Sequence, residues 1–149
     1  MDGRFESFTG LINKIAKSIR KIKTEEMSDF GIKSSHVSCV YYLYKQGDLT
    51  AGELCSFCDE DKASISRSVD FLQTNGYLEH ENNGKKTYNK KLILTEKGKQ
   101  LGEVISKKID VVLSEVGSFM SSEERIVFYK TLSKISFELE NITKNYGDK

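Results

Sequence analysis

The chain has 149 residues, of which 38% are hydrophobic and 30% charged, so it can form a core and is not an intrinsically disordered chain. Its 23 basic and 22 acidic side chains leave a net charge of +1, which excludes a uniformly basic nucleic-acid binder and leaves room only for local basic clusters. Proline is absent, which favours long uninterrupted helices.

An apolar row over the first 22 residues predicts one long amphipathic helix. Its members recur at alternating steps of three and four residues, which is the spacing of one helix face. They are Phe5, Phe8, Ile12, Ile15, Ile19 and Ile22. Residues 27–31 read as a connection, and Ser34 or Ser35 is expected to cap a second helix that runs through Tyr44.

Residues 49–76 predict two short helices joined by a tight turn. Thr50 and Glu53 form a capping box for a helix that ends near Cys58. The acidic residues 59–61 make the turn, and their charge suits the start of the next helix, from Lys62 to Asn75.

A β-hairpin is predicted directly after these helices. Residues 77–80 and 92–94 read as strands, and Asn82-Asn83-Gly84 between them is a turn signal. Helix, turn, helix and basic hairpin together present one helix to a DNA groove and one loop to the phosphates.

Two further long helices are predicted after the hairpin. Thr95 caps the first, and Ser121 with Glu124 forms a capping box for the second. Their apolar rows are Leu101, Ile105, Ile109, Val112, Val116 and Phe119, then Phe128, Leu132, Ile135, Leu139 and Ile142. A winged core of roughly 65 residues does not need all three long helices. We therefore expect the first and the last helix of the chain to bury their apolar rows against a second copy of the chain.

These patterns predict a mainly α fold of the α+β class with three segments. Residues 31–98 form a winged helix-turn-helix DNA-binding domain, residues 1–30 an N-terminal dimerisation helix, and residues 99–149 C-terminal dimerisation helices.

Four strings resemble the MarR family of bacterial transcription regulators: LTAGEL at 49–54, SISRSVDFL at 64–72, NGYL at 75–78 and LTEKG at 94–98. The resemblance covers nearly the whole chain. It implies a homodimer that binds a pseudo-palindromic operator, usually represses, and is often released by a small molecule or an oxidant. Family wings commonly carry an Asp followed by Arg near the tip, whereas residues 82–87 here are NNGKKT. The resemblance therefore supports a wing that binds phosphate, and not an arginine in the minor groove.

The predicted DNA-binding residues lie on the second short helix and on the wing. With Ile65, Val69 and Leu72 inward, helical periodicity turns Ala63, Arg67, Asp70 and Thr74 outward and places Ser64 and Ser66 on the flanks. Base contacts cluster in the N-terminal part of a recognition helix. The predicted set is Lys62, Ala63, Ser64, Ser66 and Arg67 on the helix, with Lys85, Lys86 and Thr87 on the wing. The alternative is a solvated face on which Arg67 pairs with Asp70.

The three cysteines are expected to pack in the core. Cys55 and Cys58 have the spacing of a redox or metal pair, but no further ligand set accompanies them, so no metal site and no cofactor is expected. The acidic turn beside Cys58 disfavours a thiolate. His36 is interpreted as a polar neighbour of a helix cap, and Tyr41, Tyr42 and Tyr44 either pack or line a cleft for a small aromatic effector.

The leading functional prediction is a dimeric, sequence-specific DNA-binding transcription regulator, a repressor released by a small-molecule effector. The alternative is a winged-helix protein-interaction module that does not bind DNA. An enzyme is not expected, because no nucleophile–base set or phosphate-binding loop is present. We expect a cytoplasmic protein without membrane contact, since the N-terminus has no apolar signal region and the longest apolar run, Cys39 to Tyr44, has six residues.

Overall fold

A computed structural model of the chain describes residues 4–82, 84, 86 and 89–147. The fold is mainly helical, as the sequence predicts, and it has a small sheet of three strands where two were expected. By its contacts the chain divides into two compact units, Met1–Lys108 and Ile109–Lys149.

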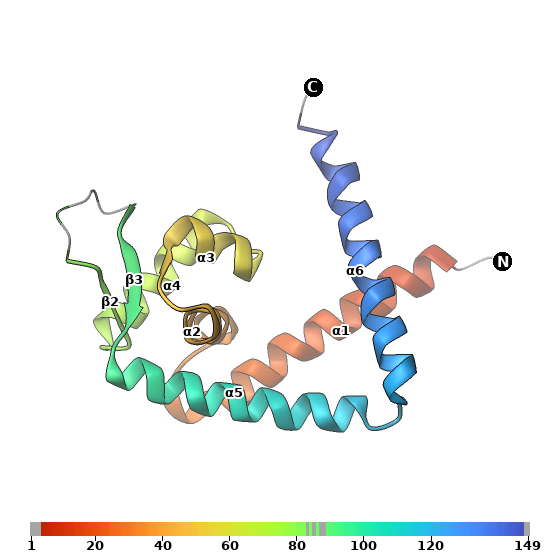
Figure 1. Cartoon of the computed structure of the whole chain (residues 1–149), viewed down its shortest axis with the longest axis horizontal. Helices are drawn as coiled ribbons and strands as arrows, with labels where there is room; N and C mark the ends of the chain where they lie inside the picture. Colours follow the sequence, from red (N-terminus) through yellow and green to blue (C-terminus); the bar gives the residue numbers. More distant parts are fainter. Residues whose placement is uncertain (1–3, 83, 85, 87–88, 148–149) are drawn as a thin grey trace. The chain divides into compact units, whose positions relative to one another are not determined.

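The predicted elements are present in the predicted order, with small differences at their ends, and a 3-10 helix and a short strand that were not predicted add to them (Figure 1). The helices are α1 (Arg4–Glu26), the 3-10 helix η1 (Ser28–Phe30), α2 (Ser34–Gln46), α3 (Ala51–Cys58), α4 (Lys62–Thr74), α5 (Glu96–Gly117) and α6 (Ser122–Lys144). The strands are β1 (Leu49–Thr50), β2 (Leu78–His80) and β3 (Lys91–Leu94).

The sheet has the order β1-β3-β2, and both strand pairs are antiparallel. Leu92 of β3 pairs with Leu49 of β1, and Leu94 pairs with Leu78 of β2. The sequence analysis did not predict β1, because a strand of two residues has no alternation that a pattern can detect.

In the first unit, α2 lies at the centre, with α3 and α4 on one side and the start of α5 on the other (Figure 1). Apolar side chains from all these elements are buried together, and burying each large one stabilises the fold by about 1.5–3 kcal/mol. They are Met27, Ile32, Val37, Cys39, Val40, Leu43, Leu49, Leu54, Ile65, Val69, Leu72, Tyr77, Leu78, Leu92, Leu94, Leu101 and Ile105.

The start of α2 differs from the prediction. Ser34 and Ser35 do not cap it: Ser34 is the first helical residue, and Lys33 holds the cap position. The Lys33 backbone N–H donates to Nδ1 of His36 at 3.1 Å, so the imidazole takes the role that a Glu or Gln side chain has at the third position of a capping box. His36 is thus a partner of the helix cap, as interpreted from the sequence.

The predicted apolar row on α1 is largely exposed. Ile12, Ile15, Ile19 and Ile22 retain between 38% and 53% of their accessible surface. An exposed apolar face on a long helix is typical of a helix that packs against another protein surface.

In the second unit, α6 starts at a capping box in which Ser121 accepts from the Glu124 N–H and Glu124 accepts from the Ser121 N–H. No residue of α6, all of which the structure describes, is buried. Its apolar row is exposed at Phe128, Leu132, Leu139 and Ile142.

Candidate nucleic-acid interface

The helix α4 is set by a cap at its start and by an apolar face. Asp61 Oδ1 accepts from the backbone N–H of Ser64 at 2.7 Å, so the acidic turn supplies the N-cap. Ile65, Val69 and Leu72 are buried against the core, as predicted. Periodicity then fixes which residues face outward.

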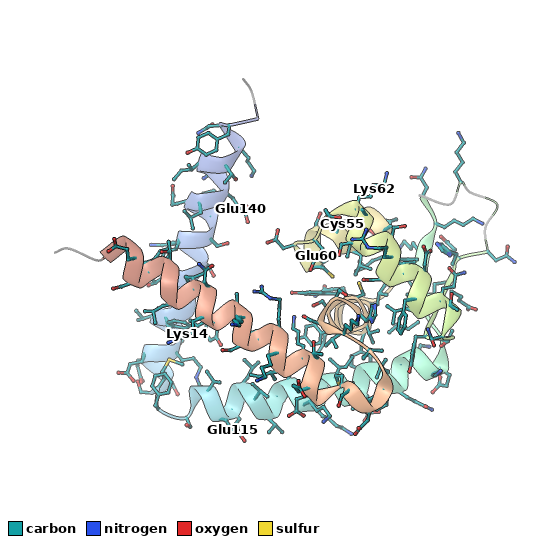
Figure 2. All side chains as sticks on the ribbon, turned by 180° about the vertical axis from the view of Figure 1, so that it is seen from behind. Lys14, Cys55, Glu60, Lys62, Glu115 and Glu140 are labelled. Atoms are coloured by element: carbon teal, nitrogen blue, oxygen red, sulfur yellow. The ribbon has the colours of Figure 1, made fainter. Side chains whose placement is uncertain are left out.

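The N-terminal half of α4 presents four of the five predicted residues to solvent. Lys62, Ala63, Ser66 and Arg67 are exposed, and Ser64 is half-buried on the flank. Figure 2 shows Lys62 at the outer edge of the two short helices. A small, polar and basic helix face of this kind suits the major groove, where Arg can donate two hydrogen bonds to guanine.

Arg67 is not paired with Asp70 in the structure. Within the described part of the chain, the ion pairs join Lys107 to Glu103 and Lys108 to Glu26. The guanidinium of Arg67 therefore remains available to another partner, which weakens the alternative of an internally paired surface face.

The wing, which is the hairpin formed by β2, β3 and the loop between them, carries basic side chains. Lys86 and Lys91 are exposed and Lys90 is half-buried, while Lys85 and Thr87 lie outside the described residues. The base of the wing is held by Glu81, whose N–H donates to the Lys91 carbonyl at 2.8 Å and whose carboxylate accepts from the Lys91 N–H at 3.3 Å. Ammonium groups on a braced hairpin suit phosphate oxygens.

The LTEKG string at 94–98 joins the end of α4 to the start of α5. The Thr95 hydroxyl donates to the Gly76 carbonyl at 2.6 Å and accepts from the Gly98 N–H at 3.1 Å. The Lys97 ammonium donates to the Asn75 carbonyl at 2.7 Å and lies 4.3 Å from the ring centre of Tyr77. We call Thr95, Lys97 and Gly98 the 95–98 clamp, because these residues fix the end of the outward-facing helix to α5.

A ring stack supports α4 from the other side. The imidazole of His36 on α2 stacks on Phe71 of α4, with ring centres 4.1 Å apart and planes 3° apart. Burial, and then the nearby Lys33 ammonium, lower the pKa of His36, so its neutral form is favoured. The neutral form is the one that can accept the Lys33 N–H.

The sequence analysis missed a polar cluster behind the two short helices. Lys23 of α1 reaches α2, and its ammonium donates to Ser38 Oγ at 2.9 Å. Ser68 of α4 is 2% exposed, although its neighbours Ser66 and Arg67 face solvent. No local pattern could have indicated this contact, because Lys23 and Ser38 are 15 positions apart in the chain.

The cysteines divide into different environments. Cys39 is buried, as expected, but Cys55 and Cys58 are only half-buried. The sequence interpretation placed only acidic residues beside Cys58, whereas hydrogen bonding with Cys39 and then the Lys23 charge lower the pKa of its thiol.

The tyrosines of α2 form part of an aromatic group on the first unit. The rings of Tyr41 and Tyr42 meet edge to face at 5.4 Å, and Tyr42 lies 5.5 Å from Phe57 of α3. Tyr41 and Tyr42 are half-buried, so each has packing contacts and an exposed edge.

The comparisons with known proteins agree with this geometry. A family model described as MarR family matches residues 30–86. A Bacillus subtilis protein named as an uncharacterized HTH-type transcriptional regulator, YwoH, is 26% identical over 117 residues, which are 78% of this chain and 85% of that protein.

Solved structures resemble most of the chain. A MarR family protein from Bacillus stearothermophilus is 25% identical with a TM-score of 0.72, covering 94% of this chain and 99% of its own. A MarR family transcriptional regulator from Listeria monocytogenes, solved with a 26mer DNA, is 20% identical with a TM-score of 0.81, covering 87% of each chain. Among the described residues, no helix is both long and apolar enough to cross a membrane.

Proposed function

We propose that the chain is a MarR family transcription regulator: a dimeric, sequence-specific DNA-binding protein, and a repressor that a small-molecule effector releases from a pseudo-palindromic operator. The match of the MarR family model to residues 30–86 supports this proposal. Residues 31–98 are the DNA-binding domain in this proposal, and residues 1–30 and 99–149 are the dimerisation segments. With DNA as its ligand, we infer that the protein acts in the cytoplasm.

One observation carries the proposal: α4 exposes a polar and basic N-terminal half, and the same helix contacts β2, the first strand of the basic hairpin. Lys62, Ser66 and Arg67 are free to meet base edges and phosphates, with Ala63 and Ser64 close by. On the wing, Lys86 is exposed, and the sequence adds Lys85 and Thr87. We assign base contacts to α4 and phosphate contacts to the wing.

The exposed apolar rows favour a second copy of the chain as the partner. The row on α1 and the row on α6 are each exposed in the single chain. Soluble proteins rarely leave contiguous apolar surface of this size in water, so both rows are assigned to a dimer interface. Two copies would also present two α4 helices to the two halves of an operator.

The half-buried tyrosines of α2 favour a small aromatic compound as the effector. Tyr41, Tyr42 and Phe57 offer ring faces and edges together with two phenol hydroxyls. Such a surface binds planar apolar molecules that carry a polar substituent.

A mobility-shift assay tests the proposal. The probes are DNA from the region around the protein's own coding sequence and random DNA of the same length. We expect tight binding to a pseudo-palindromic site, two chains per site, and release by one member of a panel of aromatic acids and phenols. Equal binding to both probes at physiological salt would refute sequence-specific regulation. Binding to neither would favour the interaction module that does not bind DNA.

A further inference from the structure

Three residues of α4 and its C-cap lie in one row along the helix. Arg67, Phe71 and Asn75 follow one another at intervals of four residues, so they share one face of the helix. Arg67 is exposed, Phe71 is half-buried, and Asn75 is the C-cap residue. Whatever fixes Phe71 and Asn75 therefore also fixes the direction in which Arg67 projects from the helix.

The end of this row is fixed by the start of α5. The Asn75 carbonyl accepts from the Lys97 ammonium at 2.7 Å, and the Asn75 side-chain amide donates to the Phe71 carbonyl at 2.8 Å. The buried side chains of α4 restrain the helix as well, but apolar contacts have no preferred direction, so they tolerate small rotations. A directional contact further along the row is needed to set the rotation of α4.

The middle of the row is fixed by an aromatic stack. The ring centres of Phe71 and of His36 on α2 are 4.1 Å apart and their planes 3° apart, so the two rings lie face to face. The other ring pairs in the described part of the chain meet edge to face or tilted, at 5.3 to 5.5 Å. Because the interaction of two rings depends on their relative geometry, turning α4 would tilt or separate this pair.

The ring of His36 is itself held at its edge. Its Nδ1 accepts from the Lys33 backbone N–H at 3.1 Å, in the turn that begins α2. Burial and then the Lys33 ammonium lower the pKa of His36, so its neutral form, with a lone pair on Nδ1, is favoured. A ring that is hydrogen bonded at its edge and stacked on its face is fixed in orientation, so it can fix the ring of Phe71 in turn.

Histidine combines both contacts in one short side chain. Phenylalanine at position 36 would keep the ring face without the acceptor, and glutamine would keep the acceptor without the ring face. We propose that His36 is a positioning residue for operator recognition: its ring sets the rotation of α4, and thereby the direction of Arg67, without itself contacting DNA. This inference rests on the proposed function, in which Arg67 contacts bases.

Proton NMR of the full-length protein tests the stack. The chain has two histidines, His36 and His80, so the imidazole C–H signals are assigned by comparison with His80→Gln. A phenyl ring stacked on the imidazole shifts the His36 signals upfield, and we expect this shift to disappear in Phe71→Leu, which keeps an apolar side chain. Signals at the position of an unfolded peptide, or an upfield shift that persists in Phe71→Leu, would overturn the proposal.

Fluorescence anisotropy tests the effect on recognition. The two probes are random DNA and the fragment, from around the protein's own coding sequence, that the mobility-shift assay finds bound. The measured quantity is the ratio of the Kd for random DNA to the Kd for this fragment. We expect His36→Gln to lower the ratio several-fold and His36→Phe to retain it, because only the second variant keeps a ring on Phe71. The reverse order would assign the effect to the cap of α2 and overturn the proposal.

Two further variants separate positioning from general stability. Ile32→Val removes one carbon from a buried side chain outside α2 and α4, so it should lower the urea midpoint of unfolding and leave the ratio unchanged. In an Arg67→Ala background, His36→Gln should not lower the ratio further, because both changes remove the same base contact. Additive losses, or an equal fall of the ratio in Ile32→Val, would refute the assigned route through Arg67.

The wild-type ratio distinguishes failure of this inference from failure of the proposed function. If wild-type protein binds both probes equally, sequence-specific regulation is refuted, and the positioning role is refuted with it. If wild type prefers the fragment and His36→Gln prefers it to the same extent, the proposed function stands and the positioning role of His36 alone is refuted.

Discussion

Replacing Gly98 by alanine should destabilise the protein more than any other substitution in α5 that adds or removes a single methyl group. A Cβ at this position would lie 1.9 Å from the Tyr77 carbonyl oxygen and 3.0 Å from Leu94 Cδ2. The carbonyl is backbone and already accepts the Thr95 N–H at 3.1 Å, so it cannot rotate away. The variant must instead shift the start of α5 away from the residues that the 95–98 clamp holds.

The size of the effect follows from three terms. Overpacking against rigid atoms costs about 3 kcal/mol, at the upper end of the usual range. Weakening of the Thr95 cap lowers the free energy of unfolding by about 1 kcal/mol, and the better helix propensity of alanine raises it by about 1 kcal/mol. The net loss is about 3 kcal/mol, or a fall of about 6–12 °C in Tm for a chain of this length.

Urea denaturation followed by circular dichroism, at a fixed protein concentration, measures this loss. Gly117→Ala is the matched control on the same helix. Its nearest neighbour would be the Arg125 guanidinium at 3.5 Å, an ordinary van der Waals distance, so we expect a change within about 1 kcal/mol. If Gly98→Ala were as stable as wild type, or Gly117→Ala the weaker of the two, the reasoning on the clamp would be refuted.

Four further outcomes follow from the structure and the sequence. Arg67→Ala should lose about 1–3 kcal/mol on the operator and much less on random DNA in an anisotropy titration; equal losses on both would assign Arg67 to phosphate. The double variant Lys85→Ala, Lys86→Ala should weaken binding to operator and random DNA alike. The slope of log Kd plotted against log salt concentration should become flatter by about one for each lost phosphate contact. A changed preference for the operator would mean that the wing contacts bases. Leu139→Glu should weaken the dimer by about 3 kcal/mol, or roughly a hundredfold in Kd, and light scattering that finds wild type monomeric at micromolar concentration would contradict the dimer. The alkylation rate of Cys58 should reach half its maximum at a lower pH than that of a cysteine in a short unfolded peptide, because hydrogen bonding with Cys39 and then the Lys23 charge lower its pKa; a midpoint at or above that of the peptide would contradict this environment.

Local signals made much of the fold predictable from the sequence. The capping boxes at Thr50 and Ser121 need only residues three apart, and both are present in the structure. The outward face of α4 followed from periodicity, because Ile65, Val69 and Leu72 fix its rotation.

The parts that the sequence could not predict depend on contacts between distant segments. The role of Lys23 requires the end of α1 to lie against α2 and α3, and the two-residue strand β1 exists only because β3 pairs with it. The string at 94–98 was noticed as a resemblance, but its physical role needed the positions of Asn75 and Gly76. Which residues touch DNA stays a prediction, since the wing tip includes Lys85 and Thr87, outside the described residues.

The cap on α4 distributes charge unevenly along the proposed interface. Asp61 occupies the Ser64 N–H, so this amide at the positive end of the helix is satisfied within the protein and is not offered to a phosphate. Asp59 and Glu60, both exposed, extend the same negative end. A duplex therefore meets repulsion at the turn between α3 and α4 and attraction at Arg67 and the wing. That asymmetry favours one polarity of approach over its reverse before any base is read.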